Sequence, residues 1–105
     1  MNNLMTNATL KQENLAFRGT AGVSENNRPA RFRPAFHDLA TGRTVLARFA
    51  DGRPAPMHLL EGLPREWVVE HDAAGRVRAI KDSVVAGFVR DGRFYTREQT
   101  AAALH

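Results

Sequence analysis

The clearest pattern of apolar and polar positions lies toward the C-terminus, in the stretch GFVRDGRFYT. The Asp-Gly dipeptide at its centre favours a two-residue hairpin turn, because both turn positions need positive φ angles. A turn of this length pairs Arg90 with Arg93 and places Phe88 opposite Tyr95. The pattern therefore predicts two antiparallel strands in this register.

A short helix is predicted directly after this hairpin. Thr96 suits the N-cap position, and Gln99 follows three residues later, as in a capping box. A helix this short is not stable alone, so it must dock on the hairpin through Ala101 and Leu104.

Both faces of the hairpin are apolar, although a strand pair with one face in water normally alternates apolar and polar residues. One face carries Val84, Ala86, Phe88 and Tyr95, and the other carries Val85, Val89 and Phe94. The short helix can cover one face at most. Unless the rest of the sheet covers the second, Phe88 and Tyr95 are expected to form an exposed patch that favours self-association or a protein partner.

Further strands are indicated upstream. RTVLARF predicts a strand over residues 43–49, and EWVVE and RVRAI, joined by the turn DAAG, predict a hairpin over 66–80. Trp67 is expected in the core, opposite Ile80. The stretch RFRPAF is not expected in a central strand, because Pro34 lacks a backbone donor.

Residues 1–30 show neither strand alternation nor a strong helical stripe. They contain six Asn and few aliphatic side chains, a composition typical of a mobile segment. We therefore expect a disordered N-terminal arm over residues 1–30 and a single small α+β domain over 31–105. The domain is predicted to be a mainly antiparallel sheet of four to six strands, built from hairpins, with a short C-terminal helix.

The positive charge is unevenly distributed. The formal net charge is +4, but residues 37–105 contain ten basic and nine acidic side chains, a balance of +1. Most of the excess lies at the end of the arm, at Arg28, Arg31 and Arg33, with Phe32 between them. Arginines beside an aromatic ring suit phosphates and stacked bases, so this segment is a candidate nucleic-acid contact.

Arg90 and Arg93 form a second basic feature, at the tip of the predicted hairpin. Like charges directly opposite each other in a sheet are mildly destabilising. A contact with an anion or an acidic partner would explain the pair. Two long side chains that splay into water would explain it as well.

No pattern for catalysis or for a cofactor is found. The chain has no cysteine, which excludes disulfides and thiolate metal sites. Neither serine lies in a nucleophile-elbow pattern, and a histidine metal site would require His37, His58 and His71 to converge. No apolar run approaches the roughly 20 residues of a membrane helix, and we expect a cytoplasmic protein with no membrane partner.

The stretches LPREWVVEHDAAGRV and GFVRDGRFYTREQ resemble those of a group of small uncharacterised bacterial proteins. The resemblance covers residues 36–102 and leaves out the arm. It implies no activity, cofactor or catalytic residue.

The sequence favours a non-enzymatic protein-interaction module. Its partner would be another protein or a second copy of the chain, contacted through Phe88, Tyr95, Arg90 and Arg93. The alternative is a nucleic-acid-associated protein that uses the basic segment 28–33. A minor alternative is an enzyme whose site has no recognisable pattern.

Overall fold

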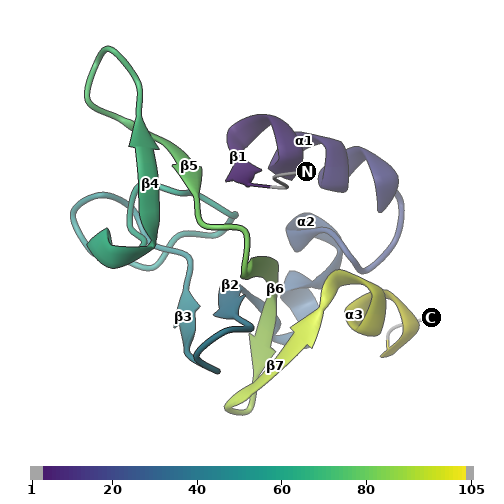
Figure 1. Ribbon diagram of the computed structural model, residues 1–105. Coiled ribbons are helices and arrows are strands. Elements are labelled where there is room, and N and C mark those ends of the chain that lie inside the picture. Colours follow the sequence, from purple (N-terminus) through teal and green to yellow (C-terminus); the bar gives the residue numbers. More distant parts are fainter. Residues whose placement is uncertain (1–3, 104–105) are drawn as a thin grey trace.

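The computed structural model describes residues 4–103, except for the side chains of Ser24 and Glu25. The strands form two antiparallel sheets, with the orders β1-β5-β4 and β3-β2-β6-β7 (Figure 1). The three-stranded sheet consists of β1 (Met5–Thr6), β4 (Val68–His71) and β5 (Val77–Ile80). The four-stranded sheet consists of β2 (Arg33–Asp38), β3 (Thr44–Leu46), β6 (Val84–Arg90) and β7 (Arg93–Thr96).

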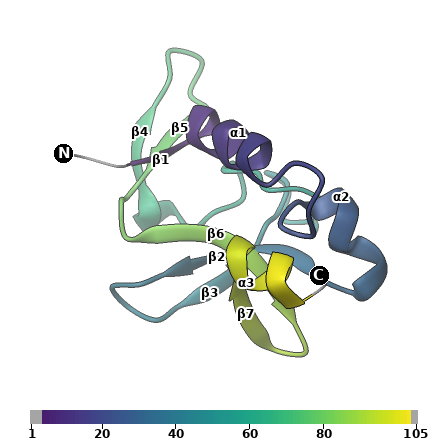
Figure 2. The same cartoon turned by 90° about the vertical axis from the view of Figure 1, so that its right-hand side faces the viewer.

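The helical segments are short. They are α1 (Asn7–Ala16), α2 (Ser24–Asn27) and α3 (Arg97–Ala103), with two 3-10 helices, η1 (Arg28–Ala30) and η2 (Arg65–Trp67). Figure 2 shows α3 lying across β6 and β7, with α1 above the sheet and α2 beside it. The predicted α+β class with antiparallel strands and a short C-terminal helix is confirmed, although the described residues form seven strands rather than four to six. Among the helices of residues 4–103, none is long and apolar enough to cross a membrane.

The β6–β7 hairpin forms in the predicted register. Arg90 pairs with Arg93, and Phe88 pairs with Tyr95. The two turn residues between the strands have φ angles of 54° and 75°. Positive φ at both positions is what an Asp-Gly turn provides, so local sequence determines this hairpin.

The capping box at the start of α3 is also confirmed. The Thr96 amide donates to Gln99 Oε1 at 2.9 Å, and the Gln99 amide donates to Thr96 Oγ1 at 3.1 Å. Of the two side chains predicted to dock this helix, Ala101 is partly buried and Leu104 lies outside the described residues. The buried side chains of α3 are Arg97 and Thr100, so the helix docks largely through polar groups.

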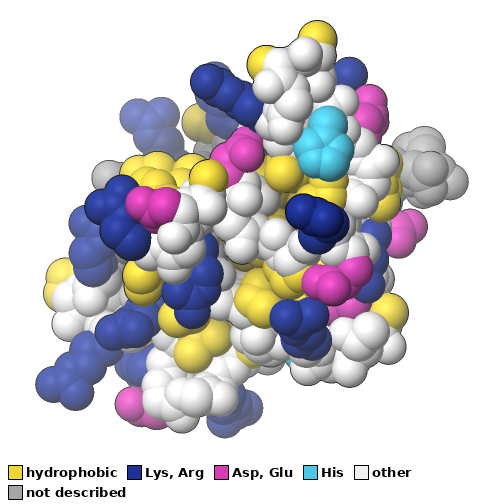
Figure 3. All heavy atoms as spheres, turned by 90° about the vertical axis from the view of Figure 1, so that its left-hand side faces the viewer, with side chains coloured by type: hydrophobic (Ala, Val, Ile, Leu, Met, Phe, Trp, Pro, Cys, Tyr) yellow, Lys and Arg dark blue, Asp and Glu magenta, His cyan; other side chains and the backbone are white. Residues whose placement is uncertain are grey.

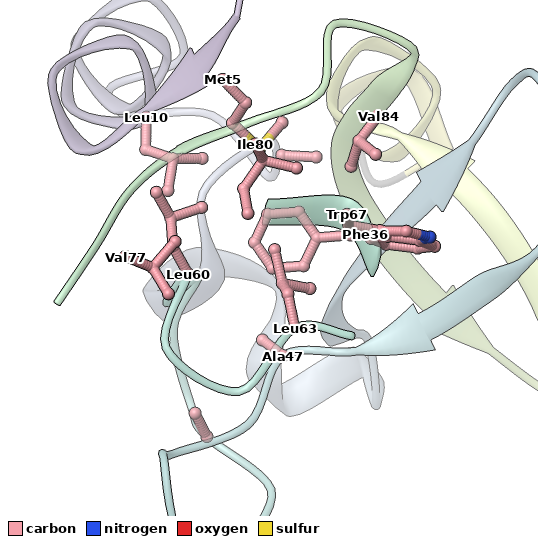
Figure 4. Close-up of a cluster of buried hydrophobic side chains, with 12 residues drawn as sticks. Met5, Leu10, Phe36, Ala47, Leu60, Leu63, Trp67, Val77, Ile80 and Val84 are labelled. Atoms are coloured by element: carbon pink, nitrogen blue, oxygen red, sulfur yellow. The ribbon is translucent and has the colours of Figure 1, made fainter. Parts of the chain in front are cut away.

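The hydrophobic core lies between the two sheets, and Figure 4 shows Trp67 and Phe36 at its centre. Trp67 is 2% exposed, which confirms its predicted burial. Its predicted pairing is wrong, because the Trp67 amide donates to the Pro64 carbonyl within η2. Strand β4 therefore starts at Val68, two residues after the predicted start, and Val68 pairs with Ile80.

Pro34 lies in β2, which is a central strand, so the expectation that this proline excludes a central position was wrong. The Pro34 carbonyl accepts from the Ala47 amide, and the Ala47 carbonyl accepts from the Ala55 amide, each at 2.9 Å. The nitrogen and the carbonyl of one strand residue face the same neighbouring strand. The Pro34 nitrogen therefore faces the Ala47 carbonyl, just past the end of β3. That carbonyl does not need a donor from Pro34, because the Ala55 amide supplies it.

The N-terminal segment departs most from the sequence-based expectation. Met5 in β1 pairs with Ile80 in β5. Met5 and Leu10 are buried in the same cluster as Trp67 (Figure 4). The disorder predicted for residues 1–30 is therefore wrong for residues 4–30, and residues 1–3 lie outside the described part of the chain.

Thr6 and Thr9 form the N-terminal cap of α1. The Thr9 amide donates to Thr6 Oγ1 at 3.1 Å, and the Thr6 amide donates to Thr9 Oγ1 at 2.8 Å. A reciprocal cap of this kind satisfies two backbone donors that would otherwise be exposed. The helix then needs only Leu10 as a buried anchor.

Leu10→Ala is expected to lower the free energy of unfolding by about 2–4 kcal/mol, because it removes the buried anchor of α1. The matched control is Leu15→Ala in the same helix, where the leucine is 61% exposed and the expected loss is below about 0.5 kcal/mol. Chemical denaturation of both variants measures the difference. Equally small effects would show that α1 does not pack on the core.

Candidate functional site

Phe88, the main residue of the predicted apolar patch, lies in the interior. It is fully buried. Its ring packs edge-on against Phe32 and His58, at centroid distances of 6.4 and 5.1 Å. The Arg97 guanidinium lies 5.9 Å from the centre of the same ring. The predicted patch is therefore wrong for Phe88, because α3 and the segment before β2 cover this face.

The other face of the hairpin carries Val85, Val89 and Phe94, which are all partly exposed. Phe94 lies over Gly87, where a Cβ atom would approach the Phe94 ring to 2.4 Å. His37, from the strand on the other side of β6, stacks on Phe94 with a centroid distance of 5.0 Å and an interplanar angle of 24°. The two rings shelter Gly87, and the rest of this face stays partly open to solvent.

Arg31, Arg33 and Arg90 line one groove where β2 begins and where β6 turns into β7. Arg28 lines an adjoining pocket with Arg33, and Arg93 pairs with Arg90 in the hairpin. We call these five residues the arginine-rich surface. The pairing of β2 with β6 places Arg33 opposite Val89. The segment that precedes β2 therefore passes beside the hairpin turn. Two groups of arginines that the sequence presented as separate candidates thus form one surface.

Aromatic rings support the hairpin arginines. The Arg90 guanidinium lies 4.2 Å from the centre of the Phe32 ring, and that of Arg93 lies 5.2 Å from the centre of the Tyr95 ring. The two rings pack edge to face at 5.3 Å. Cation–π contacts of this kind orient the guanidinium groups. Phe32 is 2% exposed, so its ring holds Arg90 and has no free face for a nucleic-acid base.

The carboxylates that form ion pairs lie away from the arginine-rich surface. The ion pairs among the described side chains are Arg43–Glu66, Arg53–Asp51, Arg78–Glu70, Lys81–Asp38 and Arg97–Glu13. Within that part of the chain, no member of the arginine-rich surface has a carboxylate partner. Figure 3 shows that Lys and Arg side chains gather on the left and lower left of one view, with fewer acidic side chains among them.

An open groove of about 480 Å³ crosses the arginine-rich surface. Arg31, Arg33 and Arg90 line it, together with the apolar side chains of Leu46 and Val89. Guanidinium groups present planar pairs of donors, so the groove can bind phosphate or carboxylate oxygens.

A buried carboxylate organises the turn between β2 and β3. Asp38 accepts hydrogen bonds from Lys81 Nζ (2.6 Å), Ser83 Oγ (2.7 Å), Thr41 Oγ1 (2.9 Å) and the Ala40 amide (3.0 Å). These bonds, that from Lys81 first, hold the pKa of Asp38 well below its usual range. Ser83 directs its proton to a carboxylate that is already fully engaged and is a weak base. The cluster therefore serves the fold and does not activate a nucleophile.

A second polar cluster surrounds Arg97. Its Nη1 donates to the Gly22 carbonyl at 2.9 Å, and its Nη2 donates to His58 Nδ1 at 3.1 Å. Its Nε lies 3.2 Å from Glu13 Oε1 in an ion pair. Because Nδ1 accepts from Arg97, His58 is neutral and donates through Nε2 to the Gly87 carbonyl at 2.7 Å. This cluster was not predicted from the sequence. The one sign of it was Arg97 at the start of the helix that was expected to dock on the hairpin.

The three histidines in the described part of the chain do not converge on a metal site. His37 stacks on Phe94, His58 packs between Phe36 and Phe88, and His71 is exposed in the β4–β5 hairpin. Residues 4–103 contain no group of three His, Asp or Glu side chains placed to hold a metal ion.

Comparison of the chain with protein-family models, with curated proteins and with solved structures gives no match.

The stability of the protein is expected to fall as the pH falls from about 6.5 to about 4. Burial, reinforced by the positive charge of Arg97, lowers the pKa of His58 from 6.5 to about 4. The unfolded chain therefore binds more protons than the folded one in this window, and the loss amounts to roughly 3 kcal/mol. Denaturation at a series of pH values measures it.

The histidine contribution is isolated by comparing the protein with its His58→Gln variant. Burial raises the pKa of Glu13, which stabilises the fold as the pH falls and so opposes the effect of His58. The variant keeps Glu13 and should lose the downward slope, whereas the control His71→Gln, in an exposed hairpin, should retain it. An unchanged slope in His58→Gln would contradict the assignment.

Proposed function

We propose that the protein is a non-enzymatic binding module whose arginine-rich surface binds an anionic macromolecule. The observation that carries this proposal is the meeting of arginines from two distant segments, residues 28–33 and the β6–β7 hairpin. None of them pairs with a carboxylate among the described side chains. Gathering like charges destabilises the folded state, and a negatively charged partner would relieve that repulsion.

The chemistry of the surface favours nucleic acid as the partner. A nucleic acid repeats its phosphates along the strand, and several guanidinium groups side by side can bind successive phosphates. Such contacts are made to the backbone and do not depend on base sequence. An acidic protein is the other partner that fits this chemistry, because its carboxylates would bind the same guanidinium groups. We also propose a cytoplasmic location, since a chain without cysteine suits a reducing compartment.

Self-association through the hairpin has less support. Phe88, on which the predicted patch depended, is fully buried, and Tyr95 is partly buried. The exposed large apolar residues are Leu15, Leu39, Met57 and Val69, which come from four different segments. Single apolar residues of this kind need no partner.

The proposal is tested with two double variants that change the net charge equally. Arg31→Gln/Arg33→Gln alters the arginine-rich surface, and Arg65→Gln/Arg76→Gln alters exposed arginines beside the other sheet. Binding to labelled DNA and RNA of mixed sequence is measured by fluorescence anisotropy over a salt series. The first variant should bind more weakly, and its slope of log K against log salt should be shallower by about 1.4–1.8. The control should keep the affinity of the unmodified protein.

An equal loss of affinity in both double variants would show that net charge, and not this surface, determines binding. Failure of the unmodified protein to bind any polyanion at low salt would refute the proposal. Thermal melts of all proteins, recorded in parallel, separate loss of binding from loss of folding.

A further inference from the structure

The groove in the arginine-rich surface has an apolar floor and a basic rim. Leu46 pairs with Ala35 across β2 and β3, and Val89 pairs with Arg33 across β2 and β6. Directly paired residues of a sheet share a face, so Leu46, Val89 and Arg33 lie on the same face of three adjoining strands. Leu46 and Val89 are each partly exposed. A ligand in the groove therefore meets apolar side chains and guanidinium groups together.

The rim also supplies one hydrogen-bond acceptor. Asp91, in the hairpin turn, is exposed and lines the groove beside Arg90. Its carboxylate would repel a phosphate or another carboxylate, and it would accept a hydrogen bond from a base amino group or a sugar hydroxyl. An occupant that carries donors as well as anions fits this rim better than one that carries anions alone.

We propose that this groove binds a single strand of nucleic acid, with phosphates on Arg31 and Arg33 and an unstacked base against Leu46 and Val89. The inference rests on the proposed function and specifies its partner. A duplex keeps its bases stacked inside and presents phosphates to a convex outline, so it reaches the rim and not the recessed floor. An unpaired strand can place a base in the groove while its backbone follows the arginines.

The occupant is charge-complementary to the groove. Three arginines and one aspartate line it, so the lining carries a net positive charge. An acidic peptide would neutralise the arginines and can donate to Asp91 through its backbone N–H groups, but the short side chains of Asp and Glu offer little apolar surface to Leu46 and Val89.

The test compares labelled single-stranded and duplex oligonucleotides of the same sequence, by anisotropy at low salt. Val89→Thr replaces a floor residue by one of nearly equal volume that also favours strands. It should weaken single-strand binding by about fivefold, since it removes apolar contact with the base, and leave duplex binding unchanged. The matched control is Val69→Thr on β4, where the valine is 52% exposed, and it should alter neither.

The outcomes separate this inference from the proposed function. Equal affinity for single strand and duplex, with no effect of Val89→Thr, would overturn the single-strand assignment. In that case, loss of binding in Arg31→Gln/Arg33→Gln would still support a site for polyanions. Displacement of the strand by polyglutamate as effectively as by unlabelled strand would assign the groove to an acidic protein and overturn the inference. Failure to bind any polyanion would refute both the single-strand inference and the proposed function. A second floor variant, Leu46→Thr, replaces Val89→Thr if melts show that the latter unfolds.

Discussion

The buried guanidinium of Arg97 is the interaction on which the placement of the N-terminal half depends. A charge in the interior is costly unless hydrogen bonds and a counter-charge surround it, and here the partners come from Glu13, Gly22 and His58. Arg97 therefore joins α1 and the segment after it to α3, although these parts lie at opposite ends of the sequence. Beyond Gly22 the chain passes through α2 and η1 to β2. The same contact thus helps to place Arg28 and the segment that follows it beside the hairpin.

Features that depend on neighbouring residues could be predicted from the sequence. The β6–β7 register and the cap at Thr96 follow from turn and capping chemistry that acts over a few residues. The position of residues 4–30 could not be predicted, because it rests on single contacts with distant partners. Met5 lies opposite Ile80, and Leu10 is the one buried residue of α1. Periodicity detects a continuous apolar stripe, and this helix has none.

The candidate site was visible in the sequence as two halves and not as a whole. The residues of both halves were singled out, but their meeting depends on the pairing of β2 with β6. Pro34 made a central strand unexpected there. The strand is possible because the Ala55 amide, from another segment, donates to the Ala47 carbonyl at the end of β3. Two aromatic residues have a different role from the one predicted. Phe32 and Phe88 were candidates for contact with partners, and the structure uses them as buried supports beneath Arg90 and Arg97.

Arg90 and Arg93 face each other although the hairpin does not require either charge. The Asp-Gly turn would form with neutral side chains at both positions, and opposed like charges oppose folding. The rings of Phe32 and Tyr95 hold the two guanidinium groups through cation–π contacts. Arg97 provides the contrast, because its carbonyl, imidazole and carboxylate partners all come from its own chain. Its charge is explained by the fold. The hairpin arginines contact rings but no carboxylate among the described side chains. A guanidinium that packs on a ring and has no carboxylate partner can still bind an anion through its donors, and this is the physical reason for placing the binding surface at the hairpin end and not at the buried arginine.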